Sequence, residues 1–264
     1  MHTLAGIDIE QVATTAPTVH ADIRIMTHNI LYGWKWGRVL DLIRFERPDI
    51  ICLQEVPHRD HRLGGAPPER IIDDLQLPNA YEMLWGAAPN AIGNMTLVRG
   101  GVGPGEILKV RWTRPYGIAN RVETCGVRLT VANVHLSPMK GPPPLAFLPT
   151  EIARFREARD LSRRFATIDT PAVALGDFNT FHPAPACWVM NRCWTDCRRA
   201  AGGRHGATRP TYGLPFVIDH IFTRGHGQVL DYRVIKSGAS DHRAVIATVR
   251  FSRNSGQASF GSVD

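Results

Sequence analysis

Residues 172–179 read Ala-Val-Ala-Leu-Gly-Asp-Phe-Asn, an apolar run that ends in a carboxylate and a carboxamide two positions apart. The run has the length and composition of a buried strand. Because alternate side chains of a strand share a face, Asp177 and Asn179 can point into one site while Phe178 packs on the other side. An Asp-x-Asn pair after a strand also fits an ordinary turn, in which both side chains bond the local backbone. The rest of the chain decides between these two interpretations.

Further apolar segments of strand length recur along the chain, and helical patterns separate several of them. The expected strands cover 23–30, 49–56, 95–98, 127–136, 172–178, 217–222 and 244–251. Helices are expected over 38–46, 69–75 and 151–165. Because strands outnumber helices, the pattern favours an α/β fold in which two sheets pack face to face with helices outside.

The ends of the chain differ from its body. Residues 1–21 and 252–264 are polar and lack periodicity, so we expect a flexible N-terminal segment and a disordered tail. The 264 residues, 44% of them hydrophobic, are compatible with one domain, which we expect over 22–251. There is no signal-peptide pattern and no run of about 18 apolar residues, so we expect a cytoplasmic monomer without a transmembrane segment.

The charge and the cysteines leave alternatives open. A net charge of +7 favours approach of a polyanion, but it also fits a generic basic surface. Three of the five cysteines, Cys187, Cys193 and Cys197, lie near His182 and His205. Because they lack Cys-x-x-Cys spacing, semi-buried thiols, or at most one disulfide, are favoured over a zinc site.

Polar side chains follow one expected strand after another, at the point where each strand ends. They are Asn29, Glu55, His135, Asp177, Asn179, Asp219, His220, Asp241 and His242. If these strand ends meet along one edge of a sandwich, the clustered acids require a cation. A hard, oxygen-rich site fits Mg²⁺ or Mn²⁺, which bind carboxylates and leave positions open for water and a phosphate. The cluster therefore predicts metal-assisted hydrolysis of a phosphoester.

Six short motifs occur in a fixed order: Thr-His-Asn-Ile at 27–30, Leu-Gln-Glu-Val at 53–56, Val-His-Leu at 134–136, Gly-Asp-Phe-Asn at 176–179, Ile-Asp-His-Ile at 218–221 and Ser-Asp-His at 240–242. Together they resemble the endonuclease/exonuclease/phosphatase superfamily, of the DNase I-like kind, over about residues 22 to 251. The resemblance implies a four-layer α/β/β/α sandwich of two mainly antiparallel sheets. It also implies a metal-dependent phosphoesterase.

The resemblance implies roles for the metal-binding side of the site. Glu55 is the expected primary ligand of Mg²⁺ or Mn²⁺. Asn29 is expected to coordinate the ion or hold the phosphate, and Asp241 to complete the ligand shell. Asp177 is expected to orient or deprotonate the attacking water, and Asn179 to hold that water or a phosphate oxygen.

The histidines receive the remaining roles. The resemblance implies that His242 bonds a nonbridging phosphate oxygen and that His135 is a leaving-group acid or a phosphate ligand. Asp219 is expected to fix the tautomer of one histidine, and the choice of histidine stays open. DNase I also pairs a glutamate with its second histidine. The matching stretch 93–98 has no acid, which puts that second pair in doubt.

Two loops bear on the substrate. Trp34, Lys35 and Trp36 follow the Asn29 strand and could stack bases and hold phosphates, or the tryptophans could pack onto the next helix. The apolar tip at 145–148 of a proline-rich loop could touch lipid or form a satellite core. The leading hypothesis is a nuclease acting on DNA or RNA. The others are a phosphatase or phosphodiesterase acting on a small phosphoester or phospholipid headgroup, such as an inositol phosphate or sphingomyelin, and a binding module that has lost catalysis.

Overall fold

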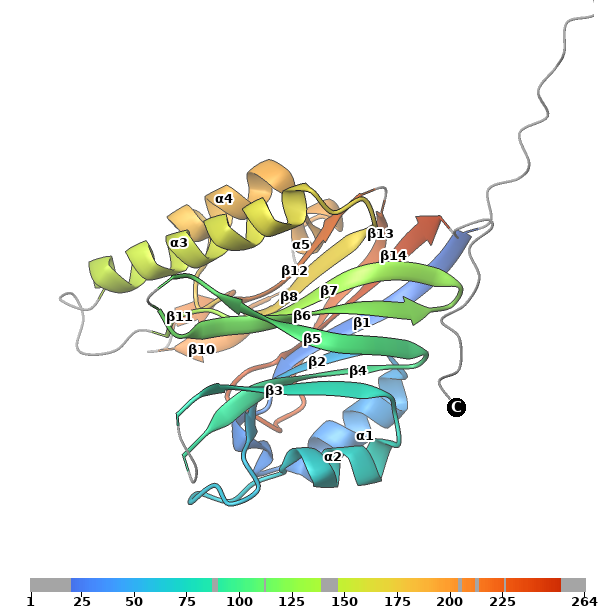
Figure 1. Cartoon of the computed structure of the whole chain (residues 1–264), viewed down its shortest axis with the longest axis vertical. Helices are drawn as coiled ribbons and strands as arrows, with labels where there is room; N and C mark the ends of the chain where they lie inside the picture. Colours follow the sequence, from blue (N-terminus) through green and yellow to red (C-terminus); the bar gives the residue numbers. More distant parts are fainter. Residues whose placement is uncertain are drawn as a thin grey trace, which may run out of the picture.

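Two six-stranded sheets pack face to face, with helices on both outer faces (Figure 1). The computed structural model describes residues 20–86, 90–111, 113–138, 147–203, 206–211, 214–225 and 227–252. The expected four-layer α/β/β/α sandwich is confirmed. None of the described helices is long and apolar enough to cross a lipid bilayer.

The first sheet has the strand order β13-β14-β1-β2-β4-β3. Its strands are β1 (His20–Asn29), β2 (Ile50–Pro57), β3 (Asn79–Trp85), β4 (Ile92–Val98), β13 (Gln228–Ile235) and β14 (Ala244–Ser252). Only β1 and β2 pair in parallel. The outer face is covered by α1 (Trp36–Glu46) and α2 (Pro68–Leu75), which follow the short 3-10 turn η1 (Leu31–Gly33) (Figure 1).

The second sheet has the order β5-β6-β7-β8-β12-β9. Its strands are β5 (Gly101–Lys109), β6 (Pro115–Thr124), β7 (Val127–His135), β8 (Ala172–Asp177), β9 (Thr195–Asp196) and β12 (Asp219–Arg224). Only β7 and β8 pair in parallel. Its outer face carries α3 (Phe147–Ala166) and α4 (Pro185–Cys193), and the short α5 (Cys197–Ala200) follows β9.

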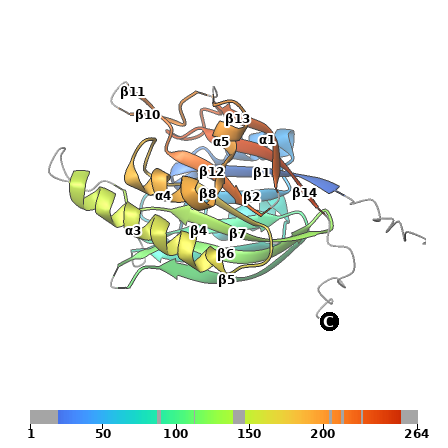
Figure 2. The ribbon, with the colours of Figure 1, turned by 90° about the horizontal axis from the view of Figure 1, so that it is seen from above.

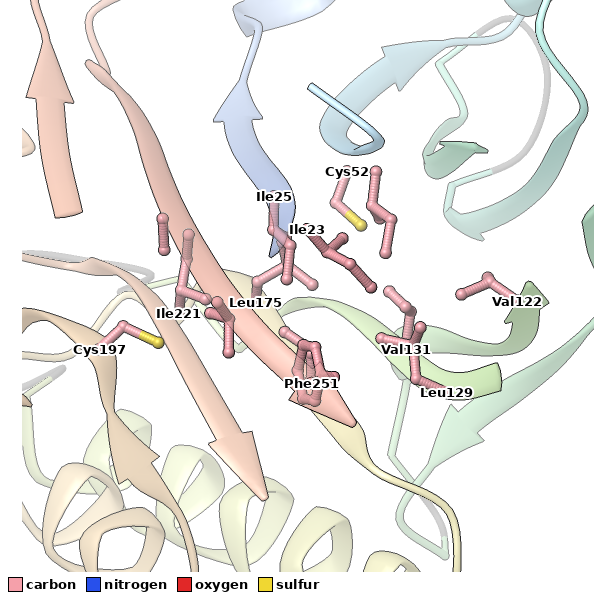
Figure 3. Packing of buried hydrophobic residues seen from close by; sticks show 14 of the residues in the cluster. Ile23, Ile25, Cys52, Val122, Leu129, Val131, Leu175, Cys197, Ile221 and Phe251 are labelled. Carbon is pink, nitrogen blue, oxygen red and sulfur yellow. The ribbon is translucent and has the colours of Figure 1, made fainter. Parts of the chain in front are cut away.

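The main core lies between the sheets. Ile23 and Ile25 of β1 face Val131 of β7 and Leu175 of β8, and Phe251 of β14 closes the cluster (Figure 3). Two further apolar clusters hold the helix layers, one under α1 and α2 and the other under α3 and α4. Burial of these apolar faces stabilises the layered arrangement.

Strand register brings the predicted polar side chains to one edge. In the parallel pairs, Asn29 lies beside Gln54, next to Glu55, and His135 lies beside Asp177. Asp219, at the start of antiparallel β12, is also the register partner of Asp177. A hairpin of β10 (Arg209–Thr211) and β11 (Leu214–Phe216) lies at one end of the sandwich, opposite the start of β1 and the end of β14 (Figures 1 and 2).

The element boundaries differ from expectation in places. Strand β1 begins at His20 and β14 ends at Ser252, because the two strands pair from His20 with Ser252 to Thr27 with Val245. The sequence missed β3, β5, β6, β13 and α4, and also the short elements β9, β10, β11 and α5. The expected segment before residue 20, the tail after residue 252, His205, and residues 145 and 146 lie outside the described residues.

Candidate active site

Asp177 is the side chain on which the site converges. Its Oδ2 accepts a hydrogen bond from Asn29 Nδ2 at 3.1 Å, and it lies 3.5 Å from His135 Nε2 and 3.6 Å from His242 Nε2. Its Oδ1 accepts from the backbone N–H of Asn179 at 2.8 Å. The carboxyl group is buried, and burial raises the pKa of Asp177 to about 6, against the opposing effect of nearby His242. Asp177 is therefore a stronger base than an exposed aspartate.

Of the two histidines that the sequence left open, His242 is the one that Asp219 contacts. Both carboxylate oxygens of Asp219 lie 3.0 Å from His242 Nδ1, and both side chains are buried. Burial alone would lower the pKa of His242, but the charges of Asp219 and Asp177 outweigh it and raise that pKa to about 9. At neutral pH His242 is thus an imidazolium whose Nε2 points toward Asp177.

His135 has the opposite electrostatic character. It is buried, and burial together with the positive charges of His242, Arg114 and Arg209 holds its pKa well below the usual value. Its Nδ1 has no hydrogen-bond partner among the described residues. The stretch 93–98, which has no acid, lies on β4. Its Asn94 amide donates to Asn133 and not to His135. His135 is therefore a neutral hydrogen-bonding group.

Asn29 and Glu55 form the oxygen-rich side of the site. Asn29 Nδ2 donates to Glu55 Oε1 at 3.0 Å, so one amide links Glu55 and Asp177. A bulge in β2 gives Glu55 a positive φ of 56° and turns it into the site. Burial raises the pKa of Glu55, and the hydrogen bond from Asn29 partly offsets this effect. The carboxylate oxygens of Glu55 fit a hard divalent cation, whereas Asn29 Oδ1 accepts the backbone N–H of Leu31 at 3.2 Å.

Asp241 and Asn179 lie at the margins of this cluster. Asp241 Oδ2 accepts from Arg209 Nη2, on β10, at 2.8 Å, and the carboxylate is half-exposed. No contact among the described residues joins it to Glu55, although its charge contributes, after burial, to the raised pKa of Glu55. Asn179 follows β8 with a φ of 50° and donates from Nδ2 to the Leu136 carbonyl at 3.1 Å.

The two tryptophans of the loop after β1 have different surroundings. Trp36 is buried between α1 and the first sheet, and its Nε1 donates to Asp74 at 2.7 Å. Trp34 is 52% exposed, and its ring lies 5.2 Å from that of Tyr32. Trp34 and Lys35 are therefore the exposed residues of this group, and Trp36 belongs to the core.

Sequence reasoning missed a second aromatic and cationic element, formed by Trp85 and Arg114. The Trp85 ring lies 4.0 Å from that of His135, and the Arg114 guanidinium lies 4.3 Å from the Trp85 ring centre on the loop before β6. Arg114 Nη2 is buried and has no partner among the described residues. The only sequence signal was an arginine before a proline near an unrecognised strand, which is too common to indicate a site.

Comparisons with known proteins identify the family and agree with the fold. The sequence profile described as the Endonuclease/Exonuclease/phosphatase family matches residues 26–242. An endonuclease/exonuclease/phosphatase from Beutenbergia cavernae has a similar structure, with 22% identity, a TM-score of 0.64, and coverage of 88% of this chain and 72% of that chain. Truncated TDP2 from Caenorhabditis elegans shows 17% identity, a TM-score of 0.64, and coverage of 86% and 97%. No curated protein matches the chain.

Proposed function

Because the chain belongs to the endonuclease/exonuclease/phosphatase family, a family of hydrolytic phosphoesterases, we propose that it is a divalent-metal-dependent phosphodiester hydrolase, specifically a nuclease. The observation that supports this most is the position of Asp177. It lies between an oxygen-rich side, Asn29 and Glu55, and an imidazolium, His242. A base placed between a cation site and a positive charge suits attack of water on a phosphodiester.

Glu55 and Asn29, with Asp241 as a further ligand, would hold Mg²⁺ or Mn²⁺. When bound, the ion would polarise the phosphate and offset charge in the transition state. Asp177 takes the proton of the attacking water, and its raised pKa suits that role. Asn179, anchored at the Leu136 carbonyl, keeps the water or a phosphate oxygen in place.

The two histidines stabilise the reacting phosphate in different ways. His242, held as an imidazolium by Asp219, donates from Nε2 to a nonbridging oxygen and supplies positive charge. His135 is neutral, so it acts as a hydrogen-bonding phosphate ligand. A strong leaving-group acid would need a higher pKa than burial allows here.

Two surface elements beside this cluster support nucleic acid as the substrate. The exposed Trp34 ring, next to Tyr32 and Lys35, offers a stacking surface for a base with a cation for the adjoining phosphate. On the His135 side, Arg114 carries a positive charge that no acid of the described residues pairs in a salt bridge. A phosphate of the same strand would satisfy it.

The test is cleavage of single-stranded DNA, RNA and plasmid DNA with Mg²⁺, alongside inositol phosphates and sphingomyelin vesicles. We expect turnover of nucleic acid. We expect Trp34→Ala to raise KM by about 5- to 100-fold, the effect of losing one stacked base, with little change in kcat. Trp188→Ala is the matched control, because Trp188 is 55% exposed on α4. Inactivity on every nucleic acid would overturn the nuclease assignment.

One observation favours a lipid or small phosphoester instead. Leu148 is 66% exposed and Ile152 43% exposed on the first turns of α3, close in sequence to the proline-rich loop. Such side chains could insert at a lipid surface. Turnover of sphingomyelin or inositol phosphate, without cleavage of nucleic acid, would establish this alternative and leave the catalytic roles unchanged.

A further inference from the structure

A second cluster of chemically reactive side chains lies where the loop after β8, helix α4 and strand β12 meet. It contains His182 on the loop after β8, Cys187 on the first turns of α4, and His220 on β12. One ligand atom from each residue lies within 4.8 Å of the others. Cys187 Sγ and His220 Nε2 are 3.8 Å apart, and the two imidazole rings are perpendicular at 5.9 Å. None of these side chains takes part in the proposed hydrolysis.

From this geometry we propose that His182, Cys187 and His220 form a zinc site, separate from the catalytic cation site. Two imidazole nitrogens and one thiolate are the ligand types that Zn²⁺ prefers, and three protein ligands leave the fourth position to water. The thiolate and the nitrogens are softer donors than the oxygens around Glu55, so the two sites would select different ions.

Asp196 adds a feature typical of zinc-bound histidines. Its Oδ2 lies 3.0 Å from His182 Nε2, which makes that nitrogen the donor and Nδ1 the nitrogen that would face the ion. Asn191 Nδ2 lies 3.4 Å from His182 Nδ1 but donates a shorter bond, 2.8 Å, to the Cys187 carbonyl. A carboxylate behind a ligating histidine orients the ring and strengthens the metal bond. The carboxylate is itself held, because Oδ1 accepts the backbone N–H of Arg198 at the start of α5.

His220 presents its Nε2 toward the Cys187 thiol. It is buried, with Nε2 2.9 Å from the Thr180 carbonyl, while Nδ1 has no partner among the described residues. On zinc binding the proton of Nε2 would move to Nδ1, and the Nε2 lone pair would bind the ion in place of the hydrogen bond to Thr180. The Thr180 carbonyl oxygen then faces the cation. Cys187 loses its thiol proton to solvent as the S–Zn bond forms.

The site would fasten α4 to β12. His220 directly follows Asp219, the carboxylate that holds His242, so a bond from α4 to His220 also restrains the strand start that carries Asp219. The sequence does not indicate this cluster, because its ligands lie at positions 182, 187 and 220 and include no Cys-x-x-Cys pair. Cys193 is exposed, and Cys197, though buried, does not belong to the cluster.

The test is titration of the chelator-stripped full-length protein with Co²⁺, in excess Mg²⁺ to fill the catalytic site. Because Co²⁺ replaces Zn²⁺ in such sites, one equivalent should produce a near-ultraviolet thiolate-to-cobalt charge-transfer band, which Zn²⁺ then abolishes. Cys187→Ser should lose the band, whereas Cys193→Ser and Cys197→Ser should keep it. This readout is independent of nuclease activity, so failure here leaves the proposed function unaffected.

His182→Ala provides a second variant if Cys187→Ser does not fold, because the His182 side chain is 29% exposed and Cys187 is buried. We expect it to weaken Zn²⁺ binding at least about tenfold in competition with a chelating dye. A wild-type protein without the cobalt band, or a band that persists in Cys187→Ser, would overturn the proposal. Unchanged Zn²⁺ affinity in folded His182→Ala would do the same.

Discussion

The bond between Asp219 and His242 sets the charge of the imidazole that faces the substrate. Burial lowers the pKa of His242, and the two carboxylates raise it to about 9, so His242 stays protonated at neutral pH and loses its proton above about pH 9. We expect kcat/KM to fall with rising pH in that range. Asp219→Asn removes one charge, so the alkaline limb should move down by about one to two pH units.

The measurement is the pH profile of kcat/KM for both proteins, with circular dichroism to show that Asp219→Asn is folded. An alkaline limb at the same pH in both proteins would mean that His242 is not the group that titrates.

At this scale the sequence located the polar residues but not their partners. Asn29, Glu55, Asp177 and Asp219 were found because each follows or begins a short apolar strand. The partner of Asp219 depends on how β12 lies against the loop before β14, which no local pattern records. Trp34 and Trp36 look equivalent in sequence, yet one is exposed and the other buried, because only Trp36 lies on the inner face of α1.

The close approach of β7 and β8 places Asp177. Gly176 has a φ of 144°, and a Cβ there would lie 1.9 Å from the Val134 carbonyl oxygen. We expect Gly176→Ala to lower the free energy of unfolding by about 3 kcal/mol and to reduce activity by displacing Asp177. Gly37→Ala is the matched control, since a Cβ at Gly37 would have no neighbouring atom within 4 Å. Alanine in α1 should raise the free energy of unfolding by up to about 1 kcal/mol.

Urea unfolding of both variants at one pH measures the difference. Equal stabilities for Gly176→Ala and Gly37→Ala would contradict the close packing of β7 on β8.

Elements were predictable where their apolar pattern was strong. Helices α1, α2 and α3 and the central strands β1, β2, β7, β8 and β14 were expected near their observed positions. Strand β5 was missed because Gly101, Gly103 and Gly105 remove the alternation that marks a strand. Edge strand β13 is only half-buried, so its composition does not distinguish it from a loop.

For the whole molecule, buried neutral histidines make stability depend on pH. Burial lowers the pKa of His28 from 6.5 to about 4. Between about pH 6.5 and pH 4 the unfolded chain therefore binds a proton that the folded protein does not bind. The contribution of His28 to the free energy of unfolding is complete above about pH 6.5 and falls as the pH drops toward 4. The loss is at most about 1.4 kcal/mol per pH unit for this group.

Urea unfolding of the chelator-stripped protein between pH 7 and pH 4.5 checks this dependence. His28→Gln should unfold with a shallower dependence on pH, whatever its absolute stability. An identical slope in the variant would show that His28 is not a source of the acid sensitivity.

At the scale of the molecule, six motifs in order were sufficient for the four-layer fold, and the family profile over residues 26–242 agrees. Each motif falls at a strand end or beside one, so their order fixes which strands must meet at one edge. Substrate preference was less accessible, because it depends on loops such as those of Trp34 and Arg114, whose positions relative to the site follow from tertiary packing.

The central claim is that Asp177 activates water at a cation-dependent phosphodiesterase site. The most direct measurement is cleavage of single-stranded DNA by chelator-stripped protein, before and after addition of Mg²⁺, for the wild type and Asp177→Asn. We predict that the stripped protein is inactive, that Mg²⁺ restores the wild type, and that Asp177→Asn stays at least about 100-fold slower while remaining folded. Full cleavage in excess chelator, or wild-type rates in Asp177→Asn, would contradict the claim.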